Sequence, residues 1–111
     1  MTYTVKNLPP SVKVGTQTYT LEVVDNSVMN DIGIYGDCNC DMRRIRIADT
    51  MPEANHAVEV VLHEITHACY RSYHIEAERG EEYTVTNIAA ALAGVLVDNP
   101  DLRKWIDKAS K

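Results

Sequence analysis

The stretch VVLHEITHACY, residues 60–70, contains two histidines four positions apart, with a glutamate directly after the first. Good helix formers surround it, and we expect a helix from about residue 50 to residue 70 or 73. Residues four apart lie on one face of a helix, so His63 and His67 can direct their imidazoles at one point. The sequence therefore predicts a metal site on this helix.

The string His-Glu-x-x-His is the helical signature of zinc peptidases. Zinc favours neutral imidazole nitrogen, and a catalytic site supplies three protein ligands while water takes the fourth position. Glu64 is displaced by one helical step from His63, so it can reach that water and act as its general base. The alternative is a surface helix whose histidines and glutamate are simply solvated.

A third ligand has to come from elsewhere in the chain. The metzincin pattern fails because Tyr73 stands ten residues after His63, where that pattern needs a histidine. His74 lies about 10 Å beyond His67 along a continuous helix, too far to share one ion, and His56 is excluded by the same distance from His63. Both are expected to be ordinary polar side chains, although His56 is in a position to line a cleft.

Glu81 and Glu82 are the remaining candidates for the third ligand. They begin a second helix after Gly80, and an antiparallel pair of helices would bring its first turn against the histidines. Both lie on stripes that continue into the apolar face of that helix, so geometry alone does not choose between them. The alternative is that these carboxylates only complement the helix dipole.

Strands are expected before the motif helix. Residues 12–25 alternate β-branched and aromatic side chains around Gly15-Thr16-Gln17, which predicts a hairpin with strands near 11–14 and 18–24. Residues 43–49 alternate arginine and isoleucine as a strand with one buried face does, and we expect this strand to form the edge of the cleft. Residues 26–41 are predicted to form a loop, with a short extended piece around Ile34 and Tyr35.

Helices are expected after the strands. Thr50 is predicted to cap the motif helix, with Glu53 three residues later completing a capping box. The second helix, residues 81–97, is apolar on most of its circumference, so we expect it to be largely buried. Asn99 followed by Pro100 predicts a short third helix through Trp105 and Ile106.

Composition limits the class of protein. The length of 111 residues favours one compact domain that spans residues 1–111. The formal net charge of −5 argues against nucleic-acid binding, although Arg43, Arg44 and Arg46 could form a local basic patch. No apolar run is long enough for a membrane span and no secretion signal is evident, so we expect a cytoplasmic protein without membrane contacts. The odd count of three cysteines, including Cys38 and Cys40, predicts free structural thiols.

VVLHEITHACY, followed after a short gap by GEEYTVTNIAAALAGVLVDNPDL, resembles the small glutamate-ligand zincin metallopeptidases of bacteriophages and mobile elements, related to the ImmA/IrrE group. The resemblance extends from about residue 9 to residue 106 and is most specific at the motif helix. It implies an α+β fold in which a small antiparallel or mixed sheet of three or four strands packs on the active-site helix, a glutamate-bearing helix and a short C-terminal helix. Ile65-Thr66, in place of the Leu-Gly of many relatives, and Ile88, where an aromatic residue is frequent, depart from that pattern and set the chain apart from the repressor-cleaving members.

The resemblance also implies the roles of the site residues. It makes His63, His67 and Glu82 the ligands of Zn²⁺, with Glu64 as the catalytic carboxylate and Glu81 as second choice to Glu82. The function expected is hydrolysis of a peptide bond in a narrow protein or peptide substrate, in a bacterial host's cytoplasm, with a partner protein possible at the cleft. The oxyanion could be steadied by His56, Tyr70, Tyr73 or Tyr83. The alternative function is a catalytically silent metal-binding regulatory or structural module.

Overall fold

The computed structural model describes residues 2–30 and 34–109, and a four-stranded mixed sheet forms its centre. The strands follow the order β2 (Ser11–Val14), β3 (Gln17–Val24), β5 (Arg44–Ala48) and β4 (Gly36–Asn39). β2 and β3 pair antiparallel, β3 and β5 pair parallel, and β4 pairs antiparallel with β5. The predicted mixed sheet is therefore confirmed.

The β2–β3 hairpin forms where the alternation of the sequence predicts it. Val14 pairs with Gln17 across a tight turn. Gly15 in this turn has a φ of +64°, a backbone angle that residues other than glycine rarely adopt. Val12 and Tyr19 face each other in the register and are both buried, while their neighbours along each strand are exposed. One face of the hairpin thus packs on the core, as a period of two requires.

The edge of the sheet differs from the prediction. β5, which we expected at the edge of the cleft, lies between β3 and β4, so that expectation is wrong. The edge is β4, within the segment predicted as a loop with a short extended piece. Its residues are poor strand formers, and their pairing with β5, from Gly36↔Ile47 to Asn39↔Arg44, overrides that local preference.

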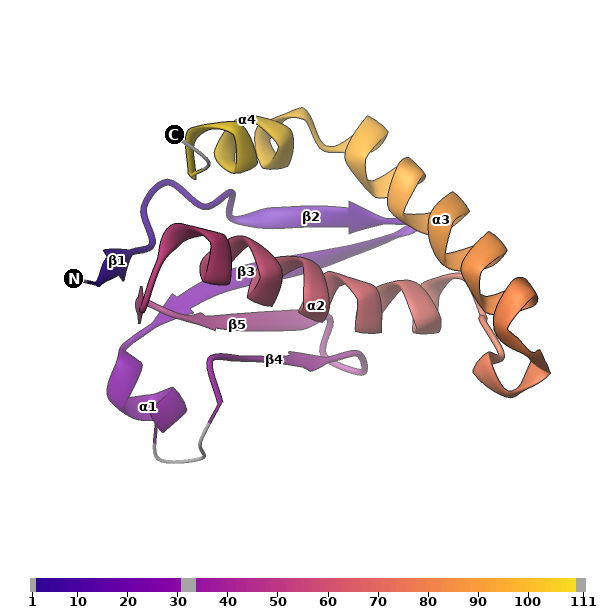
Figure 1. The fold of residues 1–111 in the computed structure, drawn as a ribbon, viewed down its shortest axis with the longest axis horizontal. Helices are drawn as coiled ribbons and strands as arrows, with labels where there is room; N and C mark the ends of the chain where they lie inside the picture. Colours follow the sequence, from indigo (N-terminus) through magenta and orange to yellow (C-terminus); the bar gives the residue numbers. More distant parts are fainter. Residues whose placement is uncertain (1, 31–33, 110–111) are drawn as a thin grey trace.

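Helices cover one face of the sheet. Figure 1 shows α2 (Ala54–Ser72) running roughly along β2 and β5 and across β3, followed by α3 (Glu81–Asp98) and α4 (Pro100–Ala109), which lies near β2. The smaller elements are α1 (Asn26–Asn30), the 3-10 turn η1 (Ala77–Arg79), and a separate two-stranded pair, β1 (Tyr3–Thr4) with β6 (Thr50–Met51). The predicted α+β class, with the motif helix and two helices after it, is confirmed.

The start of α2 differs from the predicted capping box. Thr50 pairs with Thr4 in the β1–β6 ladder, so its backbone is extended and it does not cap the helix. The N-cap position is Glu53, whose side chain makes no capping hydrogen bond. Strand pairing has moved the helix start four residues beyond the expected cap.

The second helix is less buried than its composition suggests. Within α3 only Ala91 and Val95 are buried, while the side chains of Val85 and Val97 are 55% and 74% exposed. Figure 1 shows the first turns of α3 projecting at the right of the molecule, beyond the ends of the strands. The expectation of a largely buried helix is therefore wrong.

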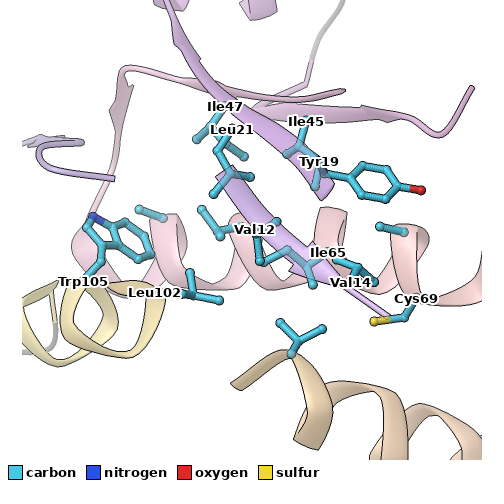
Figure 2. Close-up of a cluster of buried hydrophobic side chains, with 14 of the residues drawn as sticks. Val12, Val14, Tyr19, Leu21, Ile45, Ile47, Ile65, Cys69, Leu102 and Trp105 are labelled. Atoms are coloured by element: carbon cyan, nitrogen blue, oxygen red, sulfur yellow. The ribbon is translucent and has the colours of Figure 1, made fainter. Parts of the chain in front are cut away.

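The core lies between the sheet and the helices. Figure 2 shows Ile45 and Ile47 of β5 on one side of this core and Leu102 and Trp105 of α4 on another, with Ile65 of α2 among them. All these side chains are 4% exposed or less. The buried face of α2 is therefore fixed by packing, and its opposite face, which carries the two motif histidines, is held toward solvent.

Candidate metal centre

The two motif histidines converge on the exposed face of α2. The Nε2 atoms of His63 and His67 are 3.2 Å apart, and their ring centroids are separated by 4.9 Å at an interplanar angle of 74°. Two nitrogens bound at about 2.0–2.1 Å to a tetrahedral ion lie about 3.3 Å apart. The separation therefore fits zinc coordination, although a metal-free N–H···N hydrogen bond between the rings would have a similar length.

Glu64 completes the only group of three potential metal ligands among the described residues. We call His63, Glu64 and His67 the metal group. One ligand atom from each of His63, Glu64 and His67 lies within 4.8 Å of the other two. Glu64 is also the one charged side chain that is buried in the described part of the chain, at 7% exposure. Burial raises the pKa of Glu64 above its ordinary value, and the nearby charges of His63 and His67 oppose that rise.

Gly36 of β4 lets the edge strand approach α2 beside Glu64. A Cβ atom built on Gly36 would lie 2.8 Å from Val60 Cγ1 and 3.3 Å from Glu64 Cγ. The first of these separations is too short for a normal carbon contact. The sequence does not predict this close approach, because a glycine in a polar segment is typical of a turn. Nothing in the sequence shows that a helix packs against this position.

Two cysteines of the β4 segment also lie against α2. Cys40 Sγ is 3.8 Å from Cys38 Sγ and 3.9 Å from the carbonyl oxygen of His67. Burial raises the pKa of Cys38 to about 12, with further contributions from Cys40 and Glu64, so this thiol stays protonated at neutral pH. Neither sulfur belongs to the group of potential ligands, and both act as packing groups between strand and helix.

The predicted glutamate ligands are apart from the histidines. Glu81 and Glu82 are exposed in the first turn of α3, and neither belongs to the group that His63, Glu64 and His67 form. The structure thus brings together three of the four predicted site residues. Glu82 as third ligand stays a prediction.

The other histidines and the tyrosines fall in different places. His56 lies on α2 with its ring 4.8 Å from that of Tyr35, and it shares a surface hollow with His63. Tyr73 packs against Gly15, and Tyr83 lies under the guanidinium of Arg79 at 4.5 Å. Of the four side chains considered for the oxyanion, His56 is the one that lines a hollow together with residues of the metal group.

That hollow has a volume of about 480 Å³ and opens beside the metal group. It lies between α2 and the start of β4, and its lining consists of Ile34, Tyr35, Gly36, His56, Glu59, Val60, His63 and Glu64. The edge strand, the hollow and the two imidazoles are therefore neighbours on one surface.

Comparisons with known proteins add no relatives: no family model matches the chain, and no curated protein or solved structure matches it. The likeness to small zincins therefore rests on the motif residues and stays a prediction. In the described part of the chain, no helix combines the length and the apolar character needed to cross a membrane.

Proposed function

We propose that this protein is a zinc-dependent metallopeptidase that hydrolyses a peptide bond of a protein or peptide substrate. The observation that carries the proposal is the Nε2 pair of His63 and His67, 3.2 Å apart, with the buried carboxylate of Glu64 beside it. Both histidines are exposed, which leaves the ion accessible to water and substrate. A structural zinc site would instead be closed by four protein ligands.

Each residue has a separate role in this proposal. A bound zinc ion would polarise the scissile carbonyl and lower the pKa of the attacking water. Glu64 would accept the proton of that water and later deliver it to the leaving amine. Its carboxylate is buried beside the two imidazoles, which holds it in position for this proton transfer.

The edge strand β4 is the proposed docking site for the substrate backbone. In the described residues β4 pairs only with β5, so its outer N–H and C=O groups can bond to an extended peptide. The strand lies against α2 through Gly36, next to Glu64. A peptide added to β4 would therefore pass close to the metal group.

The proposal is tested by metal analysis and a peptidase assay on wild type and Glu64→Gln. We expect about one zinc per chain in both proteins and cleavage only by wild type, because the substitution removes the base and leaves the imidazoles. Metal-free wild type from a chelator-free preparation that also fails to take up added zinc would exclude the proposal. Equal cleavage by both proteins would assign the activity to a contaminant.

The third ligand is tested by comparing zinc affinity in Glu82→Gln and Glu81→Gln. We propose Glu82, so its loss should weaken zinc binding more than the about 10–100-fold that an outer-shell partner contributes. Glu81→Gln serves as the matched control, since it removes the neighbouring charge from the same helical turn. The reverse order of effects would assign the ligand to Glu81.

A further inference from the structure

The hollow beside the metal group has a lining with a distinct chemistry. Its wall is aromatic where Tyr35 and His56 meet edge to face, at an interplanar angle of 75°, and aliphatic at Val60. Its formal negative charge comes from Glu59 and Glu64, and no lysine or arginine is among the described residues that line it. The lining is thus suited to a long side chain with an apolar stem and a positive end.

Glu59 is the acidic group of this hollow that the proposed chemistry does not use. Its side chain is exposed and forms no ion pair with a described residue. Arg46, on the neighbouring strand β5, is already paired with Asp37 of β4, so it is engaged elsewhere. The charge of Glu59 is therefore available to a ligand.

The position of Glu59 separates this charge from the metal. Glu59 precedes His63 by four residues, about 6 Å along the axis of α2 at 1.5 Å per residue. A cation held at Glu59 lies farther from a zinc ion than one near Glu64 would, which limits their repulsion. The face of Tyr35 can add a cation–π contact to the same positive group.

Building on the proposed peptidase function, we propose that this hollow binds the side chain of a lysine or arginine next to the scissile bond. The methylene stem would pack on Val60, and the charged end would lie between Glu59 and Tyr35. A substrate aspartate or glutamate would instead meet an uncompensated carboxylate. The substrate class is thus a basic peptide segment in extended conformation.

The experiment is a peptide library, cleaved by zinc-loaded wild type and Glu59→Lys and read by mass spectrometry. For wild type we expect lysine or arginine to exceed glutamate by about tenfold or more in kcat/KM at one position adjoining the cleaved bond, the low end of what one specific contact gives. Glu59→Lys should lose this preference and accept acidic residues there. Glu78→Lys, which makes the same charge change in η1, should cleave like wild type.

The outcomes separate this inference from the function on which it rests. If wild type cleaves, Glu64→Gln does not, and the library shows no basic preference or an unchanged one in Glu59→Lys, the hollow does not read a basic side chain. If wild type cleaves no peptide better than Glu64→Gln, the peptidase function itself is wrong. Zinc content and melting temperature are measured for each variant, so that a loss of cleavage caused by lost metal or by unfolding is recognised. If Glu59→Lys shows such a loss, Glu59→Gln replaces it. Glu59→Gln must then lose the preference for basic residues for the inference to stand.

Discussion

At the scale of single residues, three side chains of α2 form the candidate metal centre. His63, Glu64 and His67 follow from one helical periodicity, and the structure brings their ligand atoms within 4.8 Å of one another. Their neighbours across the cleft were not predictable in the same way. Gly36 and Cys38 lie near Glu64 because β4 packs against α2, which is a contact between distant parts of the sequence.

Gly36 provides a residue-scale prediction. Gly36→Ala places a Cβ atom 2.8 Å from Val60 Cγ1 and 3.1 Å from the backbone oxygen of Arg46, so strand and helix must separate. We expect a loss of about 1–3 kcal/mol in the free energy of unfolding, measured by urea denaturation. Val60→Ala removes the clashing methyl, so Gly36→Ala should cost less free energy of unfolding in the Val60→Ala background than in wild type. Strictly additive effects in this double-mutant cycle would contradict the predicted contact.

The Asp37–Arg46 pair provides a prediction about pH. The two residues face each other across β4 and β5, and Arg46 donates from Nε to Asp37 Oδ1 at 3.0 Å and from its NH2 group to Oδ2. This hydrogen bonding holds the pKa of Asp37 below its ordinary value. A lowered folded-state pKa stabilises the fold above the ordinary value of about 3.9, and the benefit disappears as the pH falls through the lowered one.

Asp37→Asn should therefore lower the free energy of unfolding by about 1 kcal/mol at pH 7, as expected for a partly buried charged pair. The difference from wild type should shrink as the pH falls below about 4, where the carboxyl of the unfolded chain is protonated. Urea titrations at a series of pH values measure it. A difference that stays constant down to pH 2 would mean that Asp37 is not linked to folding through its charge.

At the scale of elements, the hairpin and the three long helices could be predicted, but the partners of some elements could not. β4 consists of residues with low strand propensity, and only its neighbour β5 makes it a strand. Thr50 has the side chain of a helix cap but is used in the β1–β6 pair. The apolar composition of α3 predicts a helix correctly, yet burial depends on which surfaces lie nearby, and Val85 is 55% exposed.

Asn99 joins two elements and provides a prediction at this scale. Its side chain accepts a hydrogen bond from Lys13 N and donates to Lys13 O, both at 2.8 Å, and it also donates to Val95 O at 2.7 Å. The amide thus occupies the outer edge of β2 as a neighbouring strand would, and it connects that edge to the α3–α4 junction. Asn99→Ala should lower the free energy of unfolding by about 1–3 kcal/mol, since three backbone groups lose a partner.

Hydrogen exchange gives a second measurement of the same change. The amide of Lys13 should exchange faster in Asn99→Ala than in wild type. Asn55→Ala, an exposed position on α2, is the matched control and should leave both quantities unchanged. Equal protection of Lys13 in both variants would show that the bond to Asn99 does not hold the strand.

At the scale of the whole molecule, the core and the two motif histidines occupy opposite faces of α2. The buried face carries Ile65 and Ala68, whereas His63 and His67 are exposed. We therefore expect that folding does not depend on a bound metal ion, and that the metal-free protein remains folded. This expectation separates the proposed enzyme from a structural metal module, in which loss of a ligand would unfold the chain.

Thermal unfolding with and without zinc measures this difference. Free zinc at about a hundredfold excess over its Kd should stabilise wild type by about 2.7 kcal/mol, which corresponds to a rise of roughly 10 °C or more in Tm. His67→Ala should keep the Tm of metal-free wild type and lose the zinc-dependent rise. A His67→Ala protein that is unfolded without zinc would favour the structural module instead.

The open side of β4 has a consequence for the protein on its own. Unpaired backbone groups along a sheet margin are a template for intermolecular β-structure, and natural proteins commonly block them with charges, bulges or coverings. Here Asp37 is the one charged residue of β4, and its carboxylate is neutralised by Arg46. Concentrated samples without substrate should therefore tend to aggregate through this margin, and a short peptide that occupies it should keep them dispersed.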